Sequence, residues 1–198
     1  MSRVITVSGV AGAGKDTIVD MAMPFLRALG IEWAPGITTR PPRLSDKPGA
    51  MNHVSHERFL TMVANGEVME YTTVVGQLYG TSTDILNAGP NGAIKISTVD
   101  GVLAIRDWMI CQRGMDPEWD LLSVYVTVPI EDAHERLRKR GWTDEQIAER
   151  DSFNLPGYGH EMMDEKHAGI WRLVIHNPDG GLEDAKDDLL HGIRTFLR

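Results

Sequence analysis

The sequence has little of several features that mark particular classes of protein. One of its 198 residues is a cysteine, Cys111, so we expect neither an intrachain disulfide nor a zinc site built from several cysteines. No apolar run is long enough to span a membrane. The 20 basic residues are outnumbered by 28 acidic ones, and the formal net charge of -8 argues against a uniformly basic surface for nucleic acid.

The remaining composition is that of an ordinary globular protein, with 42% hydrophobic and 24% charged residues. That balance excludes a disordered tail, a collagen-like repeat and a coiled coil, and the length suits one domain or one domain with an inserted subdomain. The first residues run into a strand pattern without the features of a signal peptide. We therefore expect a cytoplasmic monomer or homodimer that binds neither membranes nor nucleic acid, with Cys111 as a small buried residue.

Strand and helix patterns alternate along the chain, which favours an α/β fold with a parallel sheet flanked by helices. Turn residues dominate positions 34–52, so the block from 34 to about 90 is interpreted as an insertion. Thr143 and Gln146 form a capping-box pattern at a helix start, and the Pro-Gly-Tyr-Gly stretch at 156–159 predicts a break after that helix. The expected strands are 4–8, 93–99, 121–128 and 171–175, with β structure over 67–79 broken at Gly76, and the expected helices are 17–29, 55–65, 83–88, 131–140, 143–153 and 182–197.

Residues 9–17, Gly-Val-Ala-Gly-Ala-Gly-Lys-Asp-Thr, carry the strongest motif. Gly9 and Gly14 stand at the spacing of a phosphate-binding loop, Lys15 follows directly, and the motif lies between a predicted strand and a predicted helix. Glycines let backbone N–H groups turn inward around phosphate oxygens, the helix points its positive end at them, and the lysine adds a charge. The motif predicts the core of a P-loop NTPase that binds the phosphates of ATP.

The residue after the lysine departs from the usual motif. A phosphate-binding loop has Ser or Thr there as a Mg2+ ligand, whereas this chain has Asp16 and places Thr17 one position later. A carboxylate is a hard oxygen ligand, so Asp16 and Thr17 are candidate Mg2+ ligands. The alternative for Asp16 is an acidic residue that the dipole favours at a helix N-terminus.

A second cationic motif follows at Thr38-Thr39-Arg40-Pro41-Pro42-Arg43. Two guanidinium groups three residues apart, with two prolines between them, make a stiff fork that suits planar, bidentate binding of phosphate. Taken alone, the same stretch would be a solvated basic turn, so the surrounding sequence has to decide.

The order and spacing of several blocks resemble the guanylate kinase family over nearly the whole chain. The blocks are the phosphate loop and residues 38–43, 46–49, 66–71, 76–81, 135–141 and 175–180. The resemblance implies phosphoryl transfer from ATP to GMP or dGMP, with Mg2+. It also implies a core over residues 1–33, 91–135 and 168–198, an inserted nucleotide-binding subdomain over about 34–90 and a mobile lid over about 136–167.

The resemblance also implies roles for individual residues. Arg40 and Arg43 would hold the GMP phosphate with the Tyr79 hydroxyl, and Glu70 would bind guanine with Thr81 beside it. The implied ATP site comprises Gly9, Ala11, Gly12, Ala13, Gly14, Lys15, Asp16, Thr17, Arg136 and Asn177. The implied catalytic residues are Lys15, Arg40, Arg140 and Arg150.

A carboxylate such as Glu70 suits guanine for a physical reason. Guanine offers two donors on one edge, N1–H and the exocyclic amine, and a carboxylate accepts both. Adenine has no donor at N1 and would leave the carboxylate unpaired, so such sites discriminate by up to ~10^4-fold. Without the flanking blocks, Glu70 would be interpreted as a strand-edge glutamate.

Basic residues cluster at the end of the helix predicted over 131–140. Arg136 and Arg140 are four apart and share a face. Arg138 and Lys139 point elsewhere, and both a functional role and a solvated helix end suit them. Because the protein as a whole is acidic, the cations predicted for the site are expected to bind a small polyanion rather than to form a nucleic-acid surface.

Four departures from the family pattern bear on substrate range and rate more than on reaction class. Asn52 replaces an expected tyrosine, and an expected serine before Thr38 is missing. The strand at 93–99 lacks the family's acidic ending, so Asp100 is interpreted as a base-reading or metal-site residue. The helix break at 156–157 is the fourth.

Three alternatives to a GMP kinase stay open at this point. The Gly-Lys-Asp loop and Met51-Asn52-His53 suggest a ribose 1,5-bisphosphate phosphokinase, although Arg43 and Glu70 argue against it. Asp16 also suits a broader phage-type deoxynucleoside monophosphate kinase. A non-catalytic guanylate-kinase-like interaction module would lack the phosphate loop, which this chain keeps.

Overall fold

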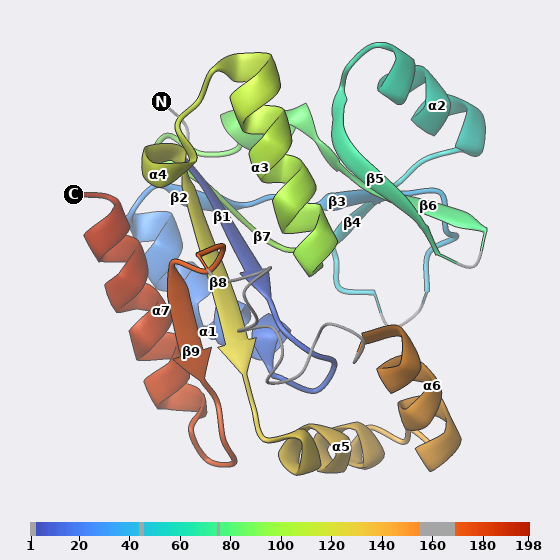
Figure 1. Cartoon of the computed structure of the whole chain (residues 1–198), viewed down its shortest axis with the longest axis vertical. Helices are drawn as coiled ribbons and strands as arrows, with labels where there is room; N and C mark the ends of the chain where they lie inside the picture. The colour runs from blue at the N-terminus through green and yellow to red at the C-terminus, as the bar shows by residue number, and fades with distance from the viewer. Residues whose placement is uncertain (1–2, 44–45, 75, 155–168) are drawn as a thin grey trace. The chain divides into compact units, whose positions relative to one another are not determined.

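The structure, a computed structural model, describes residues 3–43, 46–74, 76–154 and 169–198. It contains two compact units, one formed by Met1–Ile5 and Arg27–Leu121 and the other by Thr6–Leu26 and Leu122–Arg198. The predicted α/β class is confirmed by the alternation of strands and helices in Figure 1. The predicted break at 156–159 lies outside the described residues.

A five-stranded sheet has the strand order β2-β7-β1-β8-β9. In the first unit β2 pairs with β7 in parallel, and in the second β8 pairs with β9 in parallel. Strands β1 and β8 are buried along nearly their whole length, as expected of a parallel sheet covered on both faces. The bounds are β1 (Arg3–Ser8), β2 (Ile31–Trp33), β7 (Gly92–Ile96), β8 (Leu121–Thr127) and β9 (Leu173–His176).

The first unit also holds a four-stranded sheet with the order β4-β3-β6-β5. As predicted, β structure broken at Gly76 forms the antiparallel pair β5 and β6. Two strands within or at the end of the turn-rich stretch 34–52 were not predicted, because strands of three residues are too short to show an alternating pattern. The bounds are β3 (Gly36–Thr38), β4 (Met51–His53), β5 (Val68–Val74) and β6 (Gln77–Ser82).

The helices of the first unit include two that the sequence pattern did not predict, α3 and the short α4. Helix α3 (Val99–Arg113) begins at the N-cap Thr98, so the predicted strand 93–99 ends early, at Ile96. Gly101 in its first turn and apolar residues on several faces obscured its periodicity. The others are α2 (His56–Ala64), with Ser55 as N-cap, the 3-10 helix η1 (Thr83–Asn87) and α4 (Pro117–Asp120).

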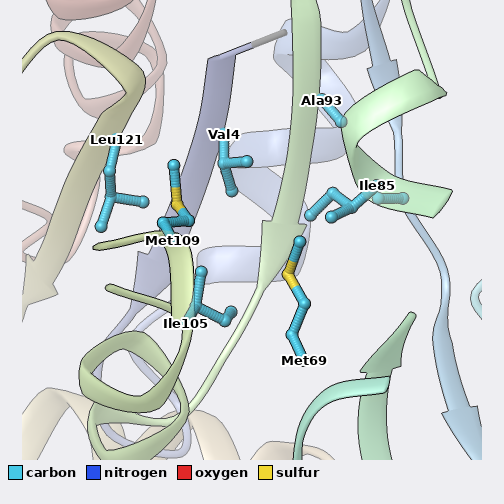
Figure 2. Packing of buried hydrophobic residues seen from close by; sticks show 8 residues of the cluster. Val4, Met69, Ile85, Ala93, Ile105, Met109 and Leu121 are labelled. Carbon is cyan, nitrogen blue, oxygen red and sulfur yellow. The ribbon is translucent and has the colours of Figure 1, made fainter. Parts of the chain in front are cut away.

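Helix α3 packs against β5 (Figure 1) and contributes to a buried apolar cluster. Figure 2 shows Ile105 and Met109 of α3 lying toward Val4 of β1, with Met69 of β5 in the same cluster. Met69 thereby anchors the strand that carries Glu70. Cys111 comes two residues after Met109, which is roughly 200° around the helix, so it is exposed and the prediction that it is buried was wrong.

Within its described residues, the second unit holds α5, α6, α7 and most of α1, and all four of these helices were predicted. The capping box is confirmed: the Thr143 amide donates to Gln146 Oε1 at 3.0 Å, and the Gln146 amide donates to Thr143 Oγ1 at 3.3 Å. No helix in the described ranges has the length and apolar character to cross a membrane. The bounds are α1 (Lys15–Ala28), α5 (Ile130–Lys139), α6 (Asp144–Asn154) and α7 (Leu182–Phe196).

Candidate active site

The glycine-rich loop between β1 and α1 adopts a backbone that requires glycine. Gly9, Gly12 and Gly14 have φ values of 146°, 82° and 89°. A Cβ on Gly9 would lie 2.3 Å from the carbonyl oxygen of Val126 in β8, and a Cβ on Gly12 would lie 2.6 Å from that of Ala133 in α5. The loop is therefore held tightly against two elements of its own unit, and side chains there would push it out of shape.

Lys15, the first residue of α1, folds back over this loop. Its Nζ donates to the carbonyl oxygens of Gly9 and Val10, each at 2.8 Å. Burial lowers the pKa of the ammonium to about 8, the Asp16 carboxylate opposes that shift, and the charges of Arg150 and Arg140 lower the pKa further. Two other predicted catalytic cations of this unit, Arg140 and Arg150, thus lie within electrostatic range of Lys15.

Two residues distant in sequence brace the loop from the side of β9. Asn177 is 2% exposed, and its Nδ2 donates to the Ala13 carbonyl at 2.7 Å. Arg136 donates from Nη2 to the Asn177 carbonyl at 2.9 Å and from Nη1 to the Gly12 carbonyl at 3.4 Å. Both were predicted as ATP-binding residues, and the structure places them where they hold the phosphate loop in shape.

Asp16 and Thr17, the predicted Mg2+ ligands, lie in the first turn of α1. Asp16 is exposed, and its charge acts on the Lys15 ammonium inside the loop. Within the described ranges no three His, Cys, Asp or Glu side chains could hold a metal ion by themselves. Nucleotide-bound Mg2+ keeps several waters and takes one or two carboxylates in addition to phosphate oxygens, so this donor set fits it.

The helices α5 and α6 carry the remaining cations. Arg140 is the C-cap of α5. Arg138 pairs with Asp144 at 2.7 Å and Lys139 with Glu135 at 2.8 Å, which favours the surface interpretation of both residues.

A contact between α5 and α6 had no signal in the sequence. His134 Nε2 lies 2.8 Å from Asp151 Oδ2, and the two residues are 17 positions apart. This pair links the helix that carries Arg136 to the helix that carries Arg150.

In the first unit, Arg40 is held by an acidic partner. Its Nη2 donates to both oxygens of Asp46, at 2.9 and 3.0 Å, and the hydrogen bond raises the pKa of the guanidinium, with a smaller contribution from Tyr79. Asp46 also accepts the backbone N–H of Arg43 at 2.8 Å. Asp46 thus holds the Arg40 side chain and the Arg43 backbone, while the Arg43 side chain is exposed.

The residues before this turn attach it to β6. Thr38 Oγ1 donates to the Leu78 carbonyl at 2.8 Å and accepts the Arg40 amide at 3.1 Å. Thr38 also lies opposite Tyr79 in the sheet register. Tyr79 also interacts with the Arg40 guanidinium, so these two predicted phosphate-binding residues lie close together.

The predicted base-reading residues lie on β5 and β6. Glu70 and Thr81 face each other across these strands, and the Thr81 hydroxyl donates to Glu70 Oε1. Lys95, which the sequence analysis did not single out, lies beside both. Asp100 is exposed in the first turn of α3, whereas Gly101 is the residue of that turn that approaches the Glu70 carboxyl.

The sequence of this chain matches a known protein family over most of its length. The sequence model described as guanylate kinase matches residues 1–179. This chain belongs to the guanylate kinase family. It is 30% identical to the guanylate kinase of Neisseria gonorrhoeae over 197 residues, which cover 96% of this chain and 85% of that protein.

Further relatives agree with the family membership. The guanylate kinase of Alkalilimnicola ehrlichii is 31% identical over 146 residues, covering 73% of this chain and 68% of that protein. The crystal structure of a guanylate kinase from Anaplasma phagocytophilum superposes with a TM-score of 0.60 at 18% identity, over 98% of this chain and 85% of that one. That likeness confirms the P-loop NTPase fold expected of this family.

Proposed function

We propose that this protein transfers the terminal phosphoryl group of ATP to GMP or dGMP, producing ADP and GDP or dGDP. The observation that carries the proposal is the glycine-rich loop with the Lys15 ammonium folded over it, in a member of the guanylate kinase family. The N-terminus of α1 and the loop amides suit the phosphates of ATP. An interaction module without catalysis would have no use for this loop.

The donor half of the reaction rests on the second unit. Phosphoryl transfer passes through a loose transition state, so the protein contributes mainly position and charge. Lys15 supplies positive charge to the phosphate oxygens, together with Arg140 and Arg150, whose charges act on Lys15. When bound, Mg2+ would neutralise the β- and γ-oxygens, and Asp16 and Thr17 would hold it.

The acceptor half rests on the first unit. Arg40 interacts with the Tyr79 side chain, and Arg43 extends from the same turn. These groups can therefore bind the phosphate of a nucleoside monophosphate. Glu70 with Thr81 then accepts the donors of a guanine edge. A ribose bisphosphate has no base edge for this pair, which is why we do not favour that alternative.

The proposal is tested by measuring ATP-dependent turnover with GMP, dGMP, AMP, CMP, UMP, dTMP and ribose 1,5-bisphosphate in parallel. We expect kcat/KM to be highest for GMP or dGMP. Lys15→Ala should lower kcat by about 10^2-fold or more, because it removes a charge from the transition state. Lys186→Met, which removes a lysine paired with Glu183 on α7, serves as control. Highest efficiency with ribose 1,5-bisphosphate or dTMP would refute the assignment.

We further propose a cytoplasmic enzyme, monomeric or homodimeric, whose partners are small-molecule nucleotides rather than nucleic acid. Support comes from the acidic net charge of -8 and from the single cysteine. Light scattering on the purified chain measures its oligomeric state.

A further inference from the structure

Lys95, near the end of β7, is a buried cation. It is 5% exposed, in a strand whose neighbours Ala93 and Ile94 are fully buried. Burial lowers the pKa of its ammonium, and the charge of Glu70 opposes that shift. Burying a charge is costly unless it is paired and hydrogen-bonded, so Lys95 must be matched to specific partners.

Those partners are the two residues proposed to read the base. The Lys95 ammonium donates to Thr81 Oγ1, and its Nζ lies 3.9 Å from Glu70 Oε1. Thr81 is 1% exposed and stands opposite Glu70 in the register, next to the irregularity between Val68 and Glu70. Such irregularities re-aim side chains, and this one sets Glu70 against Thr81.

The chemistry of the three groups fixes the direction of the hydrogen bonds that run from Lys95 through Thr81 to Glu70. An ammonium donates and cannot accept, so Thr81 Oγ1 must accept from Lys95 and use its one hydrogen for Glu70 Oε1. The Thr81 hydroxyl uses one lone pair of Oε1, and a carboxylate offers about four acceptor sites on its two oxygens, so Glu70 can accept further donors from a base.

The first turn of α3 covers the same carboxylate. A Cβ on Gly101 would lie 3.8 Å from Glu70 Cδ, so the positive end of this 15-residue helix approaches the carboxyl group. The Glu70 carboxyl group thus lies between a helix end on one side and the Thr81 hydroxyl and Lys95 ammonium on the other.

We propose that Lys95 is a positioning residue for base recognition: it fixes the direction of the Thr81–Glu70 hydrogen bond and balances the charge of Glu70, so that the carboxylate meets the base as an acceptor only. This inference rests on the proposed function, because it assumes that Glu70 binds a base edge with two donors. Without Lys95, the Thr81 hydroxyl is free to turn away and the Glu70 anion loses its counter-charge.

The test compares Lys95→Met, which keeps the length and apolar stem, with Lys95→Gln, which keeps an N–H donor without the charge. We expect Lys95→Met to raise the KM for GMP about tenfold or more, with the KM for ATP changed less than about twofold. Lys95→Gln should fall between wild type and Lys95→Met. The ratio of kcat/KM for GMP over AMP should fall in the same order. Lys186→Met is the matched control and should match wild type.

A double-mutant cycle separates positioning from general support of the fold. If Lys95 acts through Glu70, then Lys95→Met combined with Glu70→Gln should be no worse toward GMP than Glu70→Gln alone. Additive losses, or equal rises in the KM of GMP and ATP, would overturn the proposal.

Two further situations need their own criteria: Lys95 variants that do not fold, and a wild-type protein that does not phosphorylate GMP. If both Lys95 variants fail to fold, Thr81→Val is the deciding variant. It keeps the shape of the side chain but removes the hydroxyl that connects Lys95 to Glu70, so it should raise the KM for GMP and leave that for ATP unchanged. An unchanged KM for GMP would overturn the proposal. If the wild-type protein does not phosphorylate GMP, the proposed function itself has failed. If it does, and the Lys95 and Thr81 variants keep its KM for GMP, the inference about Lys95 alone has failed.

Discussion

Replacing Lys15 with methionine should stabilise the folded protein more at pH 7 than at pH 9. The folded-state pKa of Lys15 is about 8, against 10.5 for an ordinary lysine. Between these values the unfolded chain binds more protons than the folded one, so the free energy of unfolding of the wild type rises with pH. The buried ammonium therefore lowers the free energy of unfolding. The loss is complete below pH 8 and becomes smaller as the pH rises toward 10.5.

The magnitude follows from the two pKa values. At 1.36 kcal/mol per pKa unit, the charge costs about 3 kcal/mol at pH 7 and about 2 kcal/mol at pH 9. The difference in free energy of unfolding between Lys15→Met and wild type should therefore be about 1 kcal/mol larger at pH 7. Losing the hydrogen bonds to Gly9 and Val10 changes the difference between Lys15→Met and wild type by the same amount at pH 7 and at pH 9. The quantity to compare is therefore the change of that difference with pH.

The assay is urea unfolding followed by tryptophan fluorescence, compared near the transition midpoints at several pH values. The control Lys186→Met removes a lysine whose pKa is raised by its hydrogen bonds to Glu183 and Asp187, so its difference from wild type should not change between pH 7 and pH 9. A difference for Lys15→Met that is the same at both pH values would refute the depressed pKa. In activity, kcat/KM for ATP should also fall above about pH 8, as the free enzyme loses this charge.

Three further predictions concern the two halves of the site. Removing Arg40 or Arg43 should raise the KM for GMP much more than that for ATP, and a selective loss of ATP affinity would mean that these arginines serve the other substrate. Glu70→Gln should lower kcat/KM for GMP by about 10^2-fold, roughly 2–3 kcal/mol, with little loss for AMP, whereas an unchanged GMP-to-AMP ratio would exclude Glu70 as the reader. Gly14→Ala should destabilise the protein by at least about 1 kcal/mol more than Gly141→Ala in urea unfolding, because both have positive φ but only at Gly14 does a Cβ meet an atom, 2.4 Å away. Equal losses would mean that the loop relaxes around the new methyl group.

Features that depend on neighbouring residues could be predicted from the sequence. The phosphate loop is contiguous, and its glycines and lysine act within one turn of the chain, so spacing alone predicted it. The Ser55 cap and the Thr143–Gln146 capping box likewise depend on residues three positions apart. Helix α3 was missed for a related reason, because Gly101 lies in its first turn and its apolar residues do not keep to one face.

Features that depend on residues far apart in the sequence needed the tertiary structure. A lysine inside the otherwise apolar strand β7 (Gly92–Ile96) was a visible anomaly. Its partners, however, are 14 and 25 positions away and meet it only through sheet register and an irregular strand pair. The His134–Asp151 link between α5 and α6 depends in the same way on how two helices of one unit pack. The sequence by itself determined the phosphate-binding loop, because that motif is local, and the order of its motif blocks indicated the reaction class. The tertiary structure decided which charges are paired, buried or exposed around it, because pairing depends on distances that the order of residues does not specify.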